Sequence, residues 1–196
     1  MKFPMNKKFN TLLGLRLVLL LLIAFVLNIA LGHFVQFVLK TPLFLDSIGT
    51  ILVGAFLGPL AGATVGAFTN IIWYFILGDQ SILPYAITAA FIGWAAGIAF
   101  SLDGFNRFRR IVVSGLLVGI GAAIISAPIT AYIFSGVTGA GTDYLTSLLR
   151  ETGANILQAA TIQGIISDPV DKMTGSALSW MLWREVHRYF PFSKKR

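Results

Sequence analysis

The residues best suited to solute chemistry are concentrated late in the chain. Asp168, Asp171 and Lys172 supply two carboxylates and a cation. Gln158 and Gln163, a little earlier, supply amides that both donate and accept hydrogen bonds. Such groups suit recognition of a small polar solute, and we expect Gln158, Asp168 and Asp171 to bind one. The alternative for Asp171 and Lys172 is a local ion pair at a helix start.

Further polar and aromatic side chains recur near the ends of earlier apolar segments. Asp46 lies one helical turn before Thr50, so it either caps a helix or accepts a hydrogen bond from a solute. Asn70 lies deeper, where an amide without a partner is costly, and we expect it to bond another helix or a ligand. Aromatic residues at this level form either an interfacial belt or part of the site. These further candidates for solute binding are Asp46, Asn70, Trp73, Tyr74, Tyr85 and Tyr132.

Motifs of a catalytic or metal centre are missing from the sequence. It contains no HExxH, GxSxG or Walker lysine loop and no cysteine. His33 and His187 lie too far apart in the sequence to suggest a metal-ligand pair. We therefore expect no enzymatic activity, no catalytic or metal-binding residue, and no cofactor held by this chain.

The elements that position these residues belong to a membrane protein. Hydrophobic residues make up 56% of the 196 residues and charged residues 12%, against about one quarter charged in soluble domains. Residues 41–102 contain only two formal charges, Asp46 and Asp79. Because hydrocarbon penalises exposed charge, the bilayer is the natural solvent for this stretch. We expect an all-α polytopic membrane protein with one integral-membrane domain over residues 1–196.

Breaks between the apolar runs predict six transmembrane helices. Their ranges are about 12–39, 43–58, 60–77, 84–102, 111–134 and 173–189. Gly58 and Pro59 form so short a turn that the second and third helices must be an antiparallel hairpin, and Pro128 should kink the fifth. Residues 144–166 predict an amphipathic or broken helix, followed by a break at 168–172. An alternative lets residues 155–167 enter the membrane as part of the sixth helix.

The distribution of basic residues predicts the orientation in the membrane. With both termini in the cytoplasm, six alternating spans put twelve of the fifteen Lys and Arg residues on the inner side, as the positive-inside rule requires. The net charge of +7 then reflects topology and contact with anionic lipid, and we expect no nucleic-acid partner. Acidic and aromatic residues gather outside, where we expect the solute. The sequence thus predicts a multi-pass protein of the cell (plasma) membrane.

Small residues recur at four-residue spacing across the first hairpin, at Gly54, Gly58, Gly62 and Gly66. This spacing lets helix backbones approach closely, as helices do in lipid. The pattern predicts either packing within the chain or a surface that docks on a partner membrane protein.

Together these segments resemble a substrate-binding S component of an energy-coupling factor (ECF) transporter, one of a family of vitamin importers. The resemblance covers nearly the whole chain. Its short motifs are LDSIGT at residues 45–50, Leu57-Gly58-Pro59 with Asn70 after it, and DPVDK at residues 168–172. One feature departs from the family pattern. Many S components carry AxxxA on the first helix, against the coupling subunit, and the nearest equivalents here are Ala24, Asn28 and Gly32.

The resemblance implies a substrate-capture subunit of an ABC importer. Its partners would be a transmembrane coupling (T) subunit, docked on the first three helices, and two cytoplasmic ATPases that bind the ATP and Mg²⁺. The outer polar and aromatic residues favour pyridoxine, a thiamin-type pyrimidine or a nucleoside-like solute, with pantothenate and cobalamin as further options. The competing classes are a membrane sensor module that signals to a separate kinase and an intramembrane enzyme.

Overall fold

The computed structural model describes residues 7–101 and 107–189. Within these ranges the chain forms seven α-helices and no β-strand, which confirms the all-α prediction. The α-helices are α1 Lys7–His33, α2 Ile48–Leu57, α3 Pro59–Leu77, α4 Ala86–Ser101, α5 Phe108–Pro128, α6 Asp143–Glu151 and α7 Ile156–Tyr189. Three short turns extend them: the π-turn η1 Phe34–Val38 after α1, the 3-10 turn η2 Leu83–Tyr85 before α4, and the π-turn η4 Ile129–Ile133 after α5.

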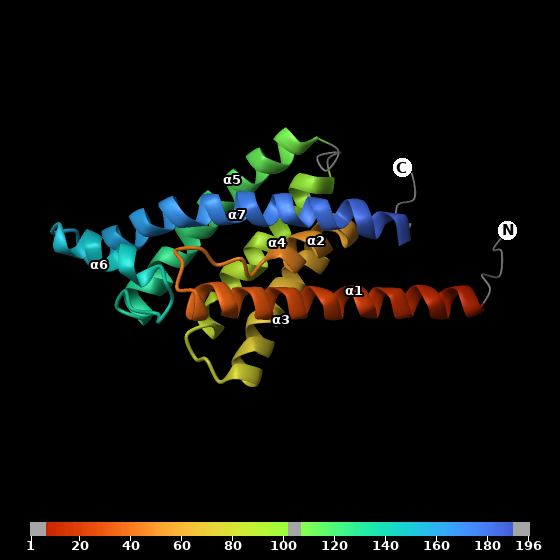
Figure 1. Ribbon diagram of the computed structural model, residues 1–196, viewed down its shortest axis with the longest axis horizontal. Helices are drawn as coiled ribbons and strands as arrows, with labels where there is room; N and C mark the ends of the chain where they lie inside the picture. The colour runs from red at the N-terminus through yellow and green to blue at the C-terminus, as the bar shows by residue number, and fades with distance from the viewer. Residues whose placement is uncertain (1–6, 102–106, 190–196) are drawn as a thin grey trace.

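Two long helices run along the molecule (Figure 1). In this view α1 and α7 run in roughly the same direction across the picture, with parts of α2 and α4 between them, while α5 extends above α7 and α3 below α1. The first turns of α1 and the last turns of α7 are at one end, and α6 is at the other. α7 packs along α5, and α3 packs along α4. Segments from the two halves of the chain therefore meet within one bundle.

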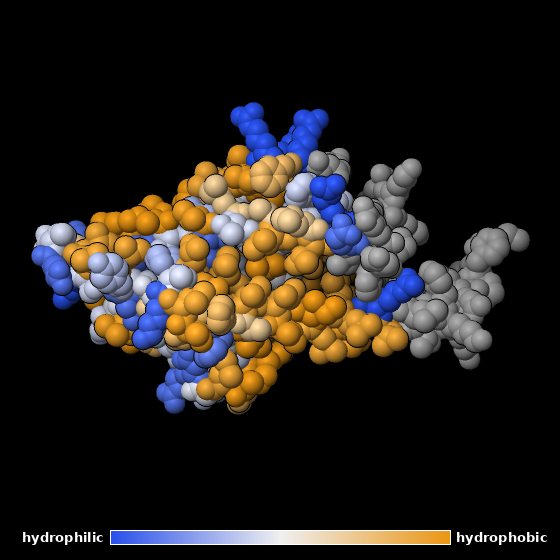
Figure 2. Space-filling model, viewed as in Figure 1, coloured by the Kyte–Doolittle hydropathy of each residue, from blue (hydrophilic) through white to orange (hydrophobic). Residues whose placement is uncertain are grey.

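Four helical stretches are long enough and apolar enough to cross a membrane: Gly14–Val38, Pro59–Leu77, Leu83–Phe100 and Phe108–Ile133. α2 is also apolar, but it has only 10 residues. Hydrophobic side chains cover the middle of the face in Figure 2, and hydrophilic side chains gather at the end that carries α6. Helix length, composition and surface thus indicate membrane association, while the count of six transmembrane helices stays a prediction.

The last helix differs from its sequence-based range. α7 runs from Ile156 to Tyr189 without interruption. The break expected at residues 168–172, and a final helix beginning at Met173, are therefore wrong. The alternative that joins residues 155–167 to the last helix describes the structure from Ile156 onward.

Packing against α5 explains why α7 continues through Pro169. A Cβ added to Gly119 of α5 would lie 2.5 Å from the Cα of Pro169, and one added to Gly115 would lie 2.7 Å from the carbonyl oxygen of Lys172. The two backbones thus touch along a strip where side chains larger than hydrogen do not fit. These tertiary contacts outweigh the local preference of proline and charged residues for a break.

Two other boundaries also shift. α2 begins at Ile48 rather than at residue 43, because residues 39–47 form an irregular loop. α5 ends at Pro128 and passes into η4, where the sequence predicted a kink. Proline lacks the N–H that would continue α-helical bonding, and a π-turn changes the register of the residues after it.

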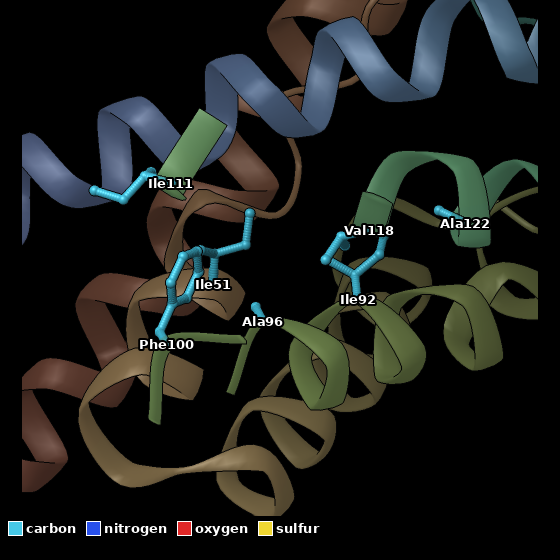
Figure 3. Close-up of a cluster of buried hydrophobic side chains, with 7 residues drawn as sticks. All are labelled: Ile51, Ile92, Ala96, Phe100, Ile111, Val118 and Ala122. Atoms are coloured by element: carbon cyan, nitrogen blue, oxygen red, sulfur yellow. The ribbon is translucent and has the colours of Figure 1, made fainter. Parts of the chain in front are cut away.

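The largest buried apolar cluster joins α2, α4 and α5 (Figure 3). It consists of Ile51, Ile92, Ala96, Phe100, Ile111, Val118 and Ala122. Ile51 and Ile111 are fully buried. Because lipid is as apolar as these side chains, close van der Waals packing within the cluster holds the three helices beside one another.

α1 is attached to α2 and α3 through the buried amide of Asn28. Its Oδ1 accepts the backbone N–H of Gly49 at 2.7 Å. Its Nδ2 donates to the hydroxyl oxygens of Thr50 at 2.8 Å and Thr69 at 3.2 Å. One side chain therefore bonds to both neighbouring helices in an otherwise apolar layer.

Candidate functional site

A cavity lies among the C-terminal ends of α1, α3 and α5, the start of α4 and the first half of α7. The space between its lining atoms, the part open to solvent included, is about 750 Å³. Apolar walls come from residues such as Ile92 and Ala122. The main polar and charged lining residues are Asp46, Asn70, Thr88, Gln163, Asp168 and Lys172.

Lys172 is the cation in the wall of this cavity. Its Nζ forms an ion pair with Asp171 and a second, at 3.3 Å, with Oδ1 of Asp46. The ammonium also lies 5.6 Å from the centre of the Phe44 ring, in the range of a cation–π contact. The lysine is almost fully buried, so these contacts replace its hydration.

Asp171 lies behind this wall and does not line the cavity. It is 0% exposed. Its Oδ1 accepts the backbone N–H groups of Phe44 at 2.8 Å and Leu45 at 2.7 Å, while Oδ2 faces Lys172. Leu45 has a φ of +50°, a conformation that costs free energy in a residue with a branched side chain. Asp171 therefore fixes the loop between α1 and α2.

Asp168 lines the cavity one turn earlier on α7. It is 4% exposed, and its Oδ2 accepts one long hydrogen bond, from the hydroxyl of Ser126 at 3.3 Å. The ion pairs formed by the described residues do not include it. A buried carboxylate with so few partners is costly, which marks Asp168 as a group suited to bind something in the cavity.

Two neutral side chains in the cavity wall also lack partners. Gln163 is 5% exposed and Thr88 is 7% exposed. Neither Nε2 of Gln163 nor Oγ1 of Thr88 has a hydrogen-bond partner among the described residues. Buried polar groups are normally bonded, so these atoms are available to a solute or to water. The sequence signal was an amide and a hydroxyl within apolar helices, but neither residue was selected as a binding candidate.

Tyr85 supplies an aromatic part of the wall. Its hydroxyl is hydrogen-bonded to that of Thr130 at 2.7 Å, and its ring stacks on Phe134 with centroids 5.7 Å apart. Asn70 donates to the carbonyl oxygen of Ile82 at 3.1 Å. These contacts hold Tyr85 and Asn70 in place before any solute binds, which lowers the entropic cost of binding.

The loop between η4 and α6 closes one side of the cavity. Asp143 accepts the backbone N–H groups of Thr138 at 2.9 Å and Gly139 at 2.7 Å. Gly141 donates its N–H to the carbonyl oxygen of Gln36 at 3.1 Å. A Cβ at Gly141 would lie 2.2 Å from the carbonyl carbon of Lys40, so this loop lies directly on the end of η1.

The structure brings four of the predicted solute-binding residues to the cavity: Asp46, Asn70, Tyr85 and Asp168. Five others lie elsewhere: Trp73, Tyr74, Tyr132, Gln158 and Asp171. Trp73 is buried against His33 and Phe37, and Tyr74 packs on Phe75. Tyr132 is 70% exposed.

Gln158 belongs to a helix cap rather than to the cavity. Its backbone N–H donates to Oδ1 of Asn155 at 2.9 Å, and the N–H of Asn155 donates to Oε1 of Gln158 at 3.0 Å. This reciprocal pair is a capping box at the start of α7. The three-residue spacing was visible in the sequence but was assigned to solute recognition.

Most of the predicted docking residues are used inside the chain. Ala24, Asn28 and Gly32 are buried, and a Cβ at Gly32 would lie 2.7 Å from the Trp73 ring. Gly62 and Gly66 contact α4: an added Cβ would lie 2.4 Å from the carbonyl oxygen of Gly93 and 2.1 Å from that of Ala89, respectively.

The remaining two docking candidates, Gly54 and Gly58, have different surroundings. Gly54 of α2 also packs on α4, where an added Cβ would lie 2.8 Å from the carbonyl oxygen of Gly93. Gly58 has a φ of +96° and forms the turn between α2 and α3, with no atom within 4 Å of an added Cβ. The glycine spacing is thus explained by internal packing and one turn.

Models of protein families, curated proteins and solved structures were compared with the chain, and none matches. Across residues 7–101 and 107–189, no group of three or more His, Cys, Asp or Glu side chains is placed to hold a metal ion.

Proposed function

We propose that this chain is the substrate-capture subunit of an ECF-type importer. It binds a water-soluble vitamin or related micronutrient in the cavity and delivers it inward with a coupling subunit and two ATPases. Capture takes place at the extracellular side of the cell membrane, and both termini face the cytoplasm. The favoured solutes remain pyridoxine, a thiamin-type pyrimidine or a nucleoside-like compound, flat molecules that suit the aromatic and polar lining.

The observation that carries this proposal is a preformed cavity with unpartnered polar groups inside an apolar helical bundle. Thr88 and Gln163 each have a buried side-chain atom without a hydrogen-bond partner among the described residues. Asp168 accepts one long hydrogen bond, from Ser126. A bundle built only for structure would gain stability from apolar residues at these positions. Their presence in the wall of a cavity that is open to solvent supports solute binding.

The energy for uptake must come from other subunits. The sequence contains no Walker lysine loop. A capture subunit needs none, because its partners hydrolyse ATP. This division of tasks fits an apolar helical bundle that contains a candidate solute cavity.

Purification from the native membrane tests the proposal. Mass spectrometry of protein purified from its native membrane in mild detergent should find a retained small solute, a coupling subunit and two ATPases. A co-purified kinase in place of these partners would favour the sensor module, and purification with neither solute nor partner would refute the proposal.

The orientation has its own test, helped by the absence of cysteine. Arg107 and Ser147 are both exposed and are replaced singly by cysteine. A membrane-impermeant maleimide added to intact cells should label the variant S147C and spare R107C. The reverse pattern would contradict a cytoplasmic placement of the two termini.

A further inference from the structure

The charges around the cavity do not balance. Asp46, Asp168 and Asp171 are three carboxylates on or directly behind its wall, and Lys172 is the one base among the described lining residues. The ammonium of Lys172 already forms ion pairs with Asp46 and Asp171. Asp168 is left without a cationic partner within 4.0 Å in the described part of the chain.

The position of Asp168 makes this imbalance informative. Its carboxylate is nearly buried, and Ser126 is a neutral donor at the long distance of 3.3 Å. Removing a carboxylate from water costs several kcal/mol unless a cation or several donors compensate. Because Asp168 lines the cavity rather than the core, a molecule inside the cavity can supply the missing partner.

The other walls limit what that molecule can be. Phe37, Phe44 and Tyr85 present aromatic rings to the cavity, and Gln163 and Thr88 present unpartnered polar atoms. An anion would face two carboxylates and only a lysine that is already paired. A flat ring would contact the aromatic lining, and polar substituents would bond the amide and hydroxyl.

We infer that the cavity recognises an organic cation, a flat ring that carries a protonated amine, amidinium or similar group, with that group bound at Asp168. This inference rests on the capture function proposed above and narrows its solute class. The cation restores charge balance beside Asp168, while Gln163 and Thr88 bond polar atoms elsewhere on the ring. Lys172 holds Asp46 and Asp171 in place and excludes a second cation from that side.

Three probes of nearly the same shape separate charge from shape. At pH 7 benzamidine is a cation, benzamide is neutral and benzoate is an anion. Binding of each to the full-length chain in mild detergent is measured by saturation-transfer NMR and by the shift in melting temperature. A charge-assisted hydrogen bond adds about 1.5–3 kcal/mol, so we expect benzamidine to bind at least about tenfold more tightly than benzamide. Benzoate should bind most weakly.

The variant Asp168→Asn tests the assigned residue. It should lose the preference for benzamidine and retain the binding of benzamide. Glu151→Gln, at the exposed end of α6, makes the same change of charge away from the cavity and should retain the preference. Size-exclusion chromatography and the melting temperature confirm that each variant is folded. If Asp168→Asn does not fold, the three probes on the unmodified chain still decide the question.

Different results would contradict different parts of the inference. Equal binding of benzamidine and benzamide, tighter binding of benzoate, or no binding of benzamidine would overturn the cationic class. A preference that survives in Asp168→Asn would overturn the role of Asp168. The capture function fails by a different result, namely purification without a coupling subunit or ATPases, so the two failures are distinguishable.

Discussion

Asp171, in the middle of α7, accepts the backbone N–H of Leu45 at 2.7 Å, although 126 residues separate them in the sequence. The same oxygen accepts the N–H of Phe44, and the other oxygen faces Lys172. One carboxylate thus joins the loop between α1 and α2 to the last helix. Its role is to position Asp46, which follows Leu45 and lines the cavity.

Replacing Asp171 by Asn should therefore destabilise the fold. The amide nitrogen would face the ammonium of Lys172, leaving a buried cation with one weak partner. Breaking a buried pair in this way costs about 3 kcal/mol, and the melting temperature in detergent measures the loss. Benzamidine binding should weaken as a consequence. Asp171→Asn combined with Lys172→Met removes both buried charges and should recover part of the stability. Lost binding at an unchanged melting temperature would instead make Asp171 a ligand-binding residue.

The second prediction concerns Asn28, because replacing it distinguishes a role in packing within the chain from a role in docking on the coupling subunit. Asn28→Leu removes hydrogen bonds to Gly49, Thr50 and Thr69. We expect a loss of about 2 kcal/mol in the stability of the isolated chain, since bonds between helices in membranes contribute less than a full buried bond. Val26→Ala, exposed on the same helix, serves as the control and should change stability little. A stable variant that no longer retains the coupling subunit would restore the docking interpretation.

The close contact between α3 and α4 depends on glycines, whose side chain is a single hydrogen atom. An added Cβ at Gly93 would lie 2.1 Å from the carbonyl oxygen of Gly62, so Gly93→Ala must push the helices apart. Overpacking of this kind costs about 1–3 kcal/mol, to be measured by thermal unfolding. Gly14→Ala is the matched control, because no atom lies within 4 Å of its added Cβ. It should be neutral or slightly stabilising. Equal behaviour of the two variants would contradict close contact between these backbones.

The capping box predicts a structural effect for Gln158 and none on binding. Asn155→Ala or Gln158→Ala should each lower stability by about 1 kcal/mol, seen as a lower melting temperature. Asn155→Ser keeps a capping oxygen and should restore most of it. The affinity for benzamidine should not change, because neither side chain lines the cavity. A selective loss of probe binding in Gln158→Ala would return this residue to the site.

The sequence predicted the local features of the fold well. The apolar run at 60–77 matches α3 at Pro59–Leu77, because a proline at its start and a glycine after its end define the helix locally. The continuity of α7 was predicted only as an alternative, because it depends on glycines of α5 that lie about fifty residues earlier. Local rules favour a break at Pro169, and only the contact with Gly119 shows why the helix continues.

Two signals in the sequence indicated residues that line the cavity. Asn70 was selected because it lies deep in an apolar segment, and Asp168 because it belongs to a cluster of polar residues between apolar segments. Tyr132 was misplaced because η4 changes the helical register after Pro128, so a regular helical wheel no longer gives its direction. The roles of Asp171 and Lys172 depend on their contact with the loop between α1 and α2. The spacing of residues along α7 does not reveal that contact.

α7 contains 34 residues, so at 1.5 Å per residue it is a rod about 51 Å long. Pro169 cannot donate a hydrogen bond to the carbonyl of Ile165, which makes this the point where the rod bends most easily. Gln163 and Lys172 lie on either side of that point, and both line the cavity. The weakest point in the backbone hydrogen bonding of this long helix thus lies beside the candidate cavity, between two residues that line it.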